Sequence, residues 1–210
     1  MLVAPAEQAR TRFARAAVID AARTLFLSRG YGATTIDAIS EAADVPQPTV
    51  YRLFSSKLGI LKSLLDVSIA GDAADVPVAG RPAVQRIFDD PSSRRQVAGF
   101  AGIVAEVNGR VGPLYRILVS ASGADQDAAT LLDDLTQQRR TGQTALVRSI
   151  ATDLRPGLTA RFAADIVHAL ASPEVYHLLV VDRAWAAARY TRWLSDTLIA
   201  QLLPDAARRE

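Results

Sequence analysis

Residues 18–65 read VIDAARTLFLSRGYGATTIDAISEAADVPQPTVYRLFSSKLGILKSLL. Near the start of this stretch, apolar residues recur at helical spacing: Val18, Ala21, Ala22, Leu25 and Phe26. This spacing places them on one face of an α-helix, which we predict over about residues 11–28. Gly30 is expected to end that helix, because glycine accepts the left-handed backbone that closes a helix.

Short helices are predicted to follow at about residues 36–43 and 57–70, with a helix of about seven residues between them that starts at the Pro46/Pro48 pair and ends near Phe54. Thr34 or Thr35 is expected to cap the first of them, since a threonine hydroxyl accepts a hydrogen bond from a free backbone N–H group. Asp44 is expected to take a left-handed conformation in the turn after it. Pro48 suits the first turn of the next helix, and Ser55 or Ser56 is expected to cap the last.

The second and third helices are joined by about four residues, the length of a helix-turn-helix connection. In that motif the second helix lies in the major groove of DNA, and its first residues reach the base edges. Glutamine bonds an adenine edge in two places, arginine pairs with guanine, and small carbon groups contact the thymine methyl. The predicted base-reading residues are Gln47, Pro48, Thr49 and Arg52.

Other groups around this helix are placed to hold phosphates. Tyr51 and Lys57 flank the base-reading residues, and Thr34 and Thr35 stand at a helix N-terminus, where free N–H groups attract anions. Residues 10–62 hold eight Lys/Arg against four Asp/Glu, whereas residues 71–210 hold sixteen of each. The basic excess therefore coincides with the predicted DNA-binding helices. Three arginines precede the motif: Arg10, Arg12 and Arg15. We expect them either to form an arm that contacts the DNA backbone or minor groove, or to lie in a solvated terminus.

The rest of the chain also shows helical periodicity and almost no β-type alternation, so an all-α fold is predicted. Residues 71–82 (GDAADVPVAGRP) are the best candidate for a linker. The helices predicted beyond it lie near 82–89, 92–110, 113–122, 126–152, 159–181 and 183–203. The last two are broadly apolar, more than a surface helix needs, which favours a subunit interface.

Composition excludes several function classes. The 210 residues include no cysteine, so disulfides, thiolate catalysis and cysteine-bound metals are excluded. His168 and His177 do not make a multi-histidine metal site. We therefore predict no catalytic residue, no metal and no cofactor. Neither a signal-peptide pattern nor an uncharged run long enough to span a membrane is present, so a cytoplasmic location is expected.

In residues 18–65 the chain resembles the tetracycline-repressor (TetR/AcrR) family of bacterial transcriptional regulators. Paired alanines, Leu-Phe, Gly-Tyr, Thr-Thr, two aliphatic residues three apart, Thr-aliphatic-Tyr, Phe and Lys stand at the family's spacings. The chain departs from the family at the turn, at the cap of the recognition helix and at the start of the fourth helix. Those departures are Asp44 for glycine, Pro46 for serine, Leu53 for a frequent histidine, and Leu58-Gly59 for acidic residues.

The resemblance implies a ligand-responsive regulator, most often a repressor that a small molecule releases from its operator. It implies a three-helix DNA-binding domain with a helix-turn-helix at 1–60, a connecting helix at 61–74, and a helical ligand-binding and dimerisation domain at 75–210. Family members form homodimers through their last two long helices. No enzymatic activity is expected.

By position, the resemblance also implies a ligand-binding wall: Phe100, Val104, Asn108, Tyr115, Leu118, Leu131, Leu135, Phe162, Ile166 and His168. Few charged residues stand among these positions, which favours an apolar or aromatic effector. The predicted dimer interface is rich in aliphatic and aromatic residues, which are common in interface cores. It consists of Val175, Leu178, Leu179, Trp185, Tyr190, Trp193 and Leu198.

Two other function classes remain open from the sequence. One is a helical partner-binding module without DNA affinity, for which the departures at Asp44, Pro46 and Leu53 leave room. The other is a helical metal-dependent enzyme, because Asp165/His168 and Glu174/His177 have the carboxylate–histidine spacing of di-iron bundles. Those two pairs point to opposite sides of a straight helix, and the other required glutamates are absent.

Overall fold

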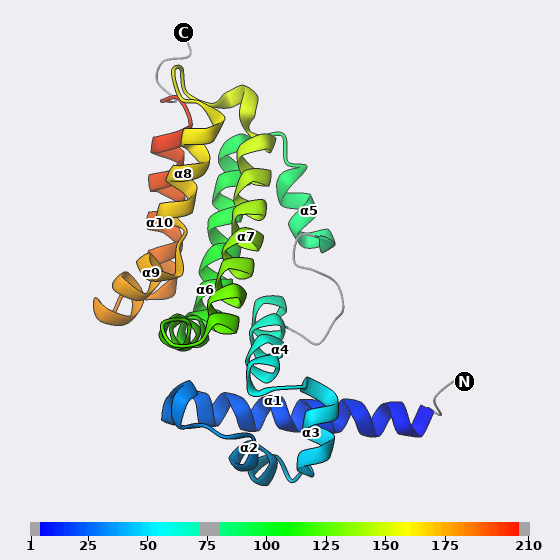
Figure 1. Cartoon of the computed structure of the whole chain (residues 1–210). Coiled ribbons are helices and arrows are strands. Elements are labelled where there is room, and N and C mark those ends of the chain that lie inside the picture. The colour runs from blue at the N-terminus through cyan, green and yellow to red at the C-terminus, as the bar shows by residue number, and fades with distance from the viewer. Residues whose placement is uncertain (1–4, 72–79, 206–210) are drawn as a thin grey trace. The chain divides into compact units, whose positions relative to one another are not determined.

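The computed structural model describes residues 5–71 and 80–205 (Figure 1). All regular structure in those ranges is helical, which confirms the predicted all-α class. Most of the predicted linker, at 72–79, lies outside the described residues. The elements are α1 (Pro5–Ala33), α2 (Ile36–Ala43), α3 (Gln47–Phe54), α4 (Lys57–Ala70), α5 (Pro82–Phe88), α6 (Ser93–Ser122), α7 (Gln126–Ser149), η2 (Ala151–Asp153), α8 (Ala160–Leu170), α9 (Pro173–Tyr176), η3 (His177–Asp182) and α10 (Ala187–Leu202).

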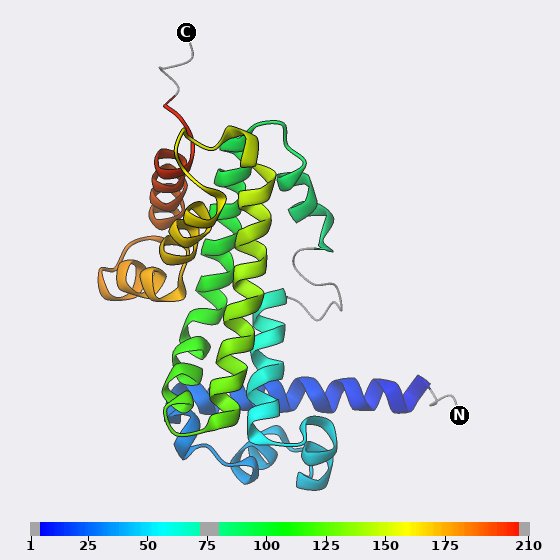
Figure 2. The same ribbon diagram turned by 45° about the horizontal axis from the view of Figure 1, so that its top comes forward.

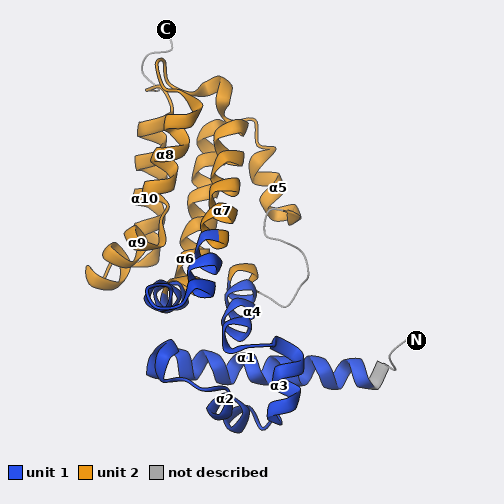
Figure 3. Ribbon diagram, in the orientation of Figure 1, with its two compact units in different colours: residues 1–68, 113–133 blue, residues 69–112, 134–210 orange. Residues whose placement is uncertain are grey.

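The chain divides into two compact units (Figure 3). Unit 1 comprises Met1–Ser68 and Pro113–Asp133, and unit 2 comprises Ile69–Gly112 and Asp134–Glu210. Each unit is thus built from two separate stretches of sequence. The division into consecutive domains at 1–60, 61–74 and 75–210 remains a prediction.

Unit 1 is organised around α1, which contacts both α2 and α3. Val18, Ala22 and Phe26 of α1 are fully buried, as the helical spacing predicts. Gly30 interrupts α1 with φ 77° and ψ 171°, a backbone conformation that is essentially restricted to glycine. Helix α4 completes this core with fully buried aliphatic side chains: Ile60, Leu61, Leu64 and Leu65.

In unit 2, parts of α6 and α7 run side by side (Figures 1 and 2), and α8 contacts α10. The core is aliphatic and aromatic, with Tyr176 and Tyr190 packed edge to face at a centroid separation of 4.8 Å. Burial raises the pKa of Tyr190 to about 12, so its hydroxyl is neutral. Fully buried members of this core include Val97, Leu146, Ile150, Val167, Leu194 and Leu198.

Several predicted helix boundaries are wrong. Helix α1 begins at Pro5 and not near residue 11, and α10 begins at Ala187 and not near residue 183. Helix α6 runs from Ser93 to Ser122 with Pro113 inside it, so residues 113–122 are not a separate helix. The neighbouring Val111 and Leu114 are buried, and their packing holds the helix together across the proline.

The predicted helix at 159–181 is interrupted. Helix α8 ends at Leu170, and the Ser172 hydroxyl then caps α9 by accepting a hydrogen bond from the Val175 N–H at 3.2 Å. Pro173 occupies the first turn of α9, where proline needs no backbone donor. A π-helical turn, η3, follows. Within the described residues, no helix is long and apolar enough to cross a membrane.

Candidate nucleic-acid interface

Helices α2 and α3 are joined by a turn of left-handed geometry. Asp44 has φ 50° and ψ 41°, which confirms the conformation predicted for it. The Ser40 hydroxyl donates to the Val45 carbonyl at 2.6 Å, and the Val45 N–H donates to the Ser40 carbonyl at 3.1 Å. These bonds satisfy backbone groups that the helix end leaves free, so the turn is stable without the family's glycine.

The recognition helix α3 separates its buried and exposed residues clearly. Val50 and Phe54 are buried in unit 1. Pro48, Tyr51 and Arg52 are exposed, and Gln47 and Thr49 are half-buried. Three to four residues separate the exposed positions, so their side chains lie on one side of the helix. All five predicted DNA contacts on α3, four to bases and one to phosphate, therefore retain side-chain surface.

Asp37 of α2 holds the side chain of Gln47. The Gln47 Nε2 group donates a hydrogen bond to Asp37 Oδ1. The amide keeps a second hydrogen and its oxygen free of this bond, and these are the donor and acceptor that an adenine edge requires. Sequence reasoning missed Asp37 because a carboxylate on α2 gives no sign of which residue of α3 it meets.

The two adjacent threonines have different roles. Thr35 is exposed and caps α2, accepting a hydrogen bond from the Ala38 N–H at 3.1 Å. Thr34 is fully buried, and its hydroxyl donates to the carbonyl of Gly30 at 2.8 Å. The expectation that Thr34 contacts DNA is therefore corrected: its side chain has no exposed surface. Thr35 remains the predicted phosphate contact.

Lys57 begins α4 and turns inward. Its ammonium donates to the carbonyls of Tyr31 at 2.7 Å and Thr34 at 2.9 Å, and it lies 4.2 Å from the centroid of the Tyr31 ring. Burial lowers the pKa of Lys57, while the Asp125 carboxylate opposes that shift. Lys57, Tyr31 and Asp125 also line a cavity of about 470 Å³ within unit 1. One ammonium hydrogen remains for a phosphate, since lysine has three donors.

Arg15 links α1 to the recognition helix instead of forming part of an arm. Its guanidinium donates to the Leu53 carbonyl at 3.2 Å and to the Ser63 hydroxyl at 2.9 Å. It also lies 4.7 Å from the centroid of the Phe54 ring. These contacts position the end of α3. Arg10 and Arg12, within the first turns of α1, are exposed.

The corner between α3 and α4 is tight. Ser55 has φ 63° and ψ −37°, and the Ser56 N–H donates to the Phe54 carbonyl at 2.7 Å. This is close to the rare γ-turn with positive φ. A Cβ atom at Gly59 would overlap the Phe54 carbonyl oxygen, so only glycine fits there. The departure from the family's acidic residue at this position thus has a steric reason.

Comparison with known proteins identifies this module. Residues 18–64 match the model for bacterial regulatory proteins of the tetR family. Residues 18–64 therefore form the DNA-binding module of the tetR family. The matched residues include α2 and α3, and the match indicates a DNA-binding transcriptional regulator.

Two relatives from Bacillus subtilis (strain 168) are HTH-type transcriptional regulators of uncharacterised role. YvkB is 42% identical over 48 residues, which are 23% of this chain and 25% of YvkB. YdeS is 27% identical over 167 residues, which are 78% of this chain and 77% of YdeS. The chain thus spans a quarter of the first relative and about three quarters of the second.

The TetR fold extends beyond the DNA-binding helices. The structure of SmeT in complex with triclosan matches 92% of this chain and 93% of its own, with a TM-score of 0.69 and 18% sequence identity. At that identity the likeness establishes the fold only.

The structure divides the predicted ligand wall between the two units. Tyr115, Leu118 and Leu131 are buried in unit 1, and the other residues belong to unit 2. Phe162 is 58% exposed, and His168 lines a cavity of unit 2. The remaining predicted residues are buried or half-buried in unit 2: Phe100, Val104, Asn108, Leu135 and Ile166. The wall stays a prediction.

The predicted dimer interface divides by exposure. Leu178 is 53% exposed, so its side chain has surface to offer a second copy. Tyr190 and Leu198 are fully buried within the chain, so their assignment to an interface is corrected: they hold α10 in the core. The half-buried members remain predicted interface residues: Val175, Leu179, Trp185 and Trp193.

Proposed function

We propose that this protein is a homodimeric transcriptional repressor that binds an operator through α3 and is released by a small molecule. The observation that carries the proposal is the α2–α3 pair, where a defined turn leaves all five predicted DNA contacts of α3 with exposed side-chain surface. Gln47, Pro48, Thr49 and Arg52 read bases, and Thr35, Tyr51 and Lys57 hold phosphates.

The similar proteins support the repressor and ligand parts of the proposal. SmeT is the repressor of a Stenotrophomonas maltophilia multidrug efflux pump, and one of its structures is a complex with triclosan. The predicted ligand-wall residues of this chain are mostly apolar or aromatic, which suits a small molecule with an apolar or aromatic body. A ligand lowers operator affinity only if it binds more tightly to the conformation that does not bind DNA than to the one that does.

A binding assay with DNA from upstream of the protein's own gene tests the function. We expect a salt-sensitive complex that prefers this DNA to a scrambled duplex of equal length. Equal affinity for both duplexes contradicts operator recognition. Absence of any complex supports the partner-binding alternative.

Lys57→Met is expected to weaken binding to specific and scrambled DNA alike. If Lys57 donates its remaining hydrogen to a phosphate, the slope of log affinity against log salt falls by about 1. Lys62→Met is the control, because Lys62 is an exposed lysine paired with Asp66 on the same helix. A lower melting temperature with an unchanged salt slope assigns Lys57 a purely intramolecular role.

Leu178→Glu is expected to convert the dimer into a monomer at micromolar concentration. Placing a carboxylate in an apolar interface removes a charge from water without a partner, which costs several kcal/mol. Leu27→Glu is the matched control, since Leu27 is 49% exposed on α1 and outside the predicted interface. Light scattering after size exclusion gives the mass, and an unchanged dimer in Leu178→Glu places the interface elsewhere.

A further inference from the structure

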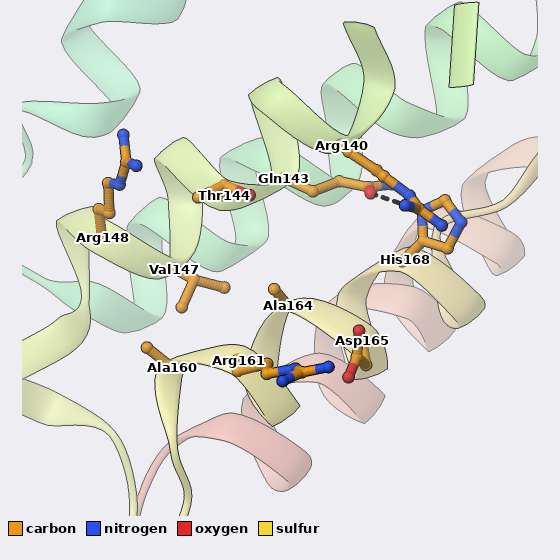
Figure 4. A pocket seen from close by; sticks show the side chains of 10 residues that line it. All are labelled: Arg140, Gln143, Thr144, Val147, Arg148, Ala160, Arg161, Ala164, Asp165 and His168. Atoms are coloured by element: carbon orange, nitrogen blue, oxygen red, sulfur yellow. Dashed lines mark hydrogen bonds between the residues drawn. The ribbon is translucent and has the colours of Figure 1, made fainter. Parts of the chain in front are cut away.

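Helices α7 and α8 border an open cavity of about 580 Å³ in unit 2 (Figure 4). This volume lies within the range of about 300–1,000 Å³ that is common for small-molecule sites. Val147, Ala160 and Ala164 give it an apolar floor of small side chains. The cavity is therefore large enough to hold a small organic molecule, and its apolar floor can contact the carbon skeleton of that molecule.

Arginine side chains dominate the charge of this cavity. Arg140 and Arg148 line it from α7 and Arg161 from α8, at separate places along the cavity, against one lining carboxylate, Asp165 (Figure 4). Within the described residues, none of these three guanidinium groups has a hydrogen-bond or ion-pair partner. Guanidinium groups bind carboxylates, sulfonates and phosphates through two parallel hydrogen bonds.

The inner wall of the cavity adds a polar network. Gln143 is 3% exposed, and its amide oxygen lies 2.9 Å from His168 Nδ1. Because an amide oxygen only accepts, the Nδ1 atom carries the proton, and the His168 Nε2 lone pair faces Arg139 Nη2 at 3.5 Å.

Arg139 is a further cation behind this wall. Its Nε and Nη1 atoms are buried without a hydrogen-bond partner in the described structure, and Nη1 forms a salt bridge with Glu174 Oε2 at 3.8 Å. Burial lowers the pKa of His168, and the charges of Arg139 and Arg140 lower it further. His168 therefore adds no positive charge of its own. The positive charge of the cavity comes from its three lining arginines, which exceed its one lining carboxylate.

We propose that this α7–α8 cavity binds an organic anion, which is attracted by the unpaired guanidinium groups of Arg140, Arg148 and Arg161 around it and whose apolar part rests on Val147, Ala160 and Ala164. The role of this anion as the effector rests on the proposed function. The expected class of effector is thereby narrowed from an apolar or aromatic molecule to one that also has an acidic group.

Two probes that differ only in charge test the site in the full-length protein. The anionic probe is 8-anilinonaphthalene-1-sulfonate, and the neutral probe is N-phenyl-1-naphthylamine, the same molecule without the sulfonate. The Arg140→Gln/Arg161→Gln variant is expected to bind the anionic probe at least about tenfold more weakly, because two of the three positive charges that line the cavity are removed. Its affinity for the neutral probe is expected to be unchanged.

The control removes the same charge elsewhere, through Arg86→Gln and Arg116→Gln, two exposed positions on α5 and α6. Equal affinity of wild type and the Arg140/Arg161 variant for the anionic probe overturns the proposal. An equal loss for both probes also overturns it, because the recognition is then apolar. Loss of the dimer in the Arg140/Arg161 variant overturns it as well, because the arginines then bind acidic groups of a second copy.

A second measurement separates this site from the proposed function. We expect the anionic probe to release wild-type protein from operator DNA but not the Arg140/Arg161 variant. Arginine-dependent binding without release supports the site and overturns its role as the effector site. If wild-type protein forms no operator complex, the proposed repressor function fails, while arginine-dependent probe binding still supports the anion site.

Discussion

Gly59→Ala is expected to lower the free energy of unfolding by about 3 kcal/mol, at the upper end of the usual cost of overpacking. The added Cβ would overlap the Phe54 carbonyl oxygen and lie 3.1 Å from the carbonyl carbon. Both are backbone atoms at the end of the recognition helix, so no flexible side chain can move aside. Relief requires a shift of α3 against α4, which also weakens operator binding.

Chemical denaturation followed by circular dichroism at fixed protein concentration measures this effect. Gly142→Ala is the matched control, because Gly142 lies inside α7 and a Cβ there meets nothing within 4 Å. That substitution is expected to stabilise the protein by up to about 1 kcal/mol, since alanine is the better helix former. Equal midpoints for the two variants refute the steric account of Gly59.

Gln47→Ala is expected to remove about 1–3 kcal/mol of discrimination at one operator base pair. Gln47 is half-buried at the start of α3, where a helix-turn-helix protein reads base edges. Competition binding against operators mutated one position at a time locates the base pair. A uniform loss of affinity at every position contradicts a base-reading role for this side chain.

Asp37→Ala tests whether α2 orients that glutamine. Without the Asp37 acceptor, the Gln47 amide rotates freely, so discrimination at the same base pair is expected to fall. Affinity for scrambled DNA is expected to rise, because a negative charge near the phosphates is removed.

Glu41→Ala removes an exposed carboxylate from the same helix and is the control for that charge effect. Its affinity for scrambled DNA is expected to rise with little change in discrimination. Identical effects of Asp37→Ala and Glu41→Ala on discrimination show that the Asp37–Gln47 bond does not position the reading group.

The sequence predicted the DNA-binding helices closely because local signals mark each boundary there. Helices α2 and α4 begin and end at the predicted residues, and α3 ends at Phe54 as predicted, with Thr35 as the cap of α2 and Asp44 in the left-handed turn. Further along the chain, Gly112-Pro113 wrongly predicted a break between two helices, because buried neighbours of the proline keep α6 continuous. At Ser172-Pro173 a valid cap signal was present but was outweighed by the long apolar pattern around it.

The candidate site was predictable in residue type but not in side-chain direction. Thr34 and Thr35 are equivalent in sequence, yet only the fold shows that the Thr34 hydroxyl bonds the Gly30 carbonyl. Likewise, the position of Lys57 predicts a phosphate contact, whereas its bonds to two carbonyls arise from the way α1 meets α4. Contacts between residues far apart in sequence decide these orientations, and no local pattern encodes them.

The discontinuity of unit 1 bears on how DNA specificity can be transferred between proteins. A fragment that ends at Ser68 omits Pro113–Asp133, which belongs to the same compact unit and buries Leu114, Leu118 and Ala128. It also lacks Asp125, which lines a cavity with Lys57 and Tyr31. A chimera that exchanges only the N-terminal helices would therefore join mismatched surfaces. To transfer the DNA-binding unit to another protein, both segments of unit 1 must be grafted together.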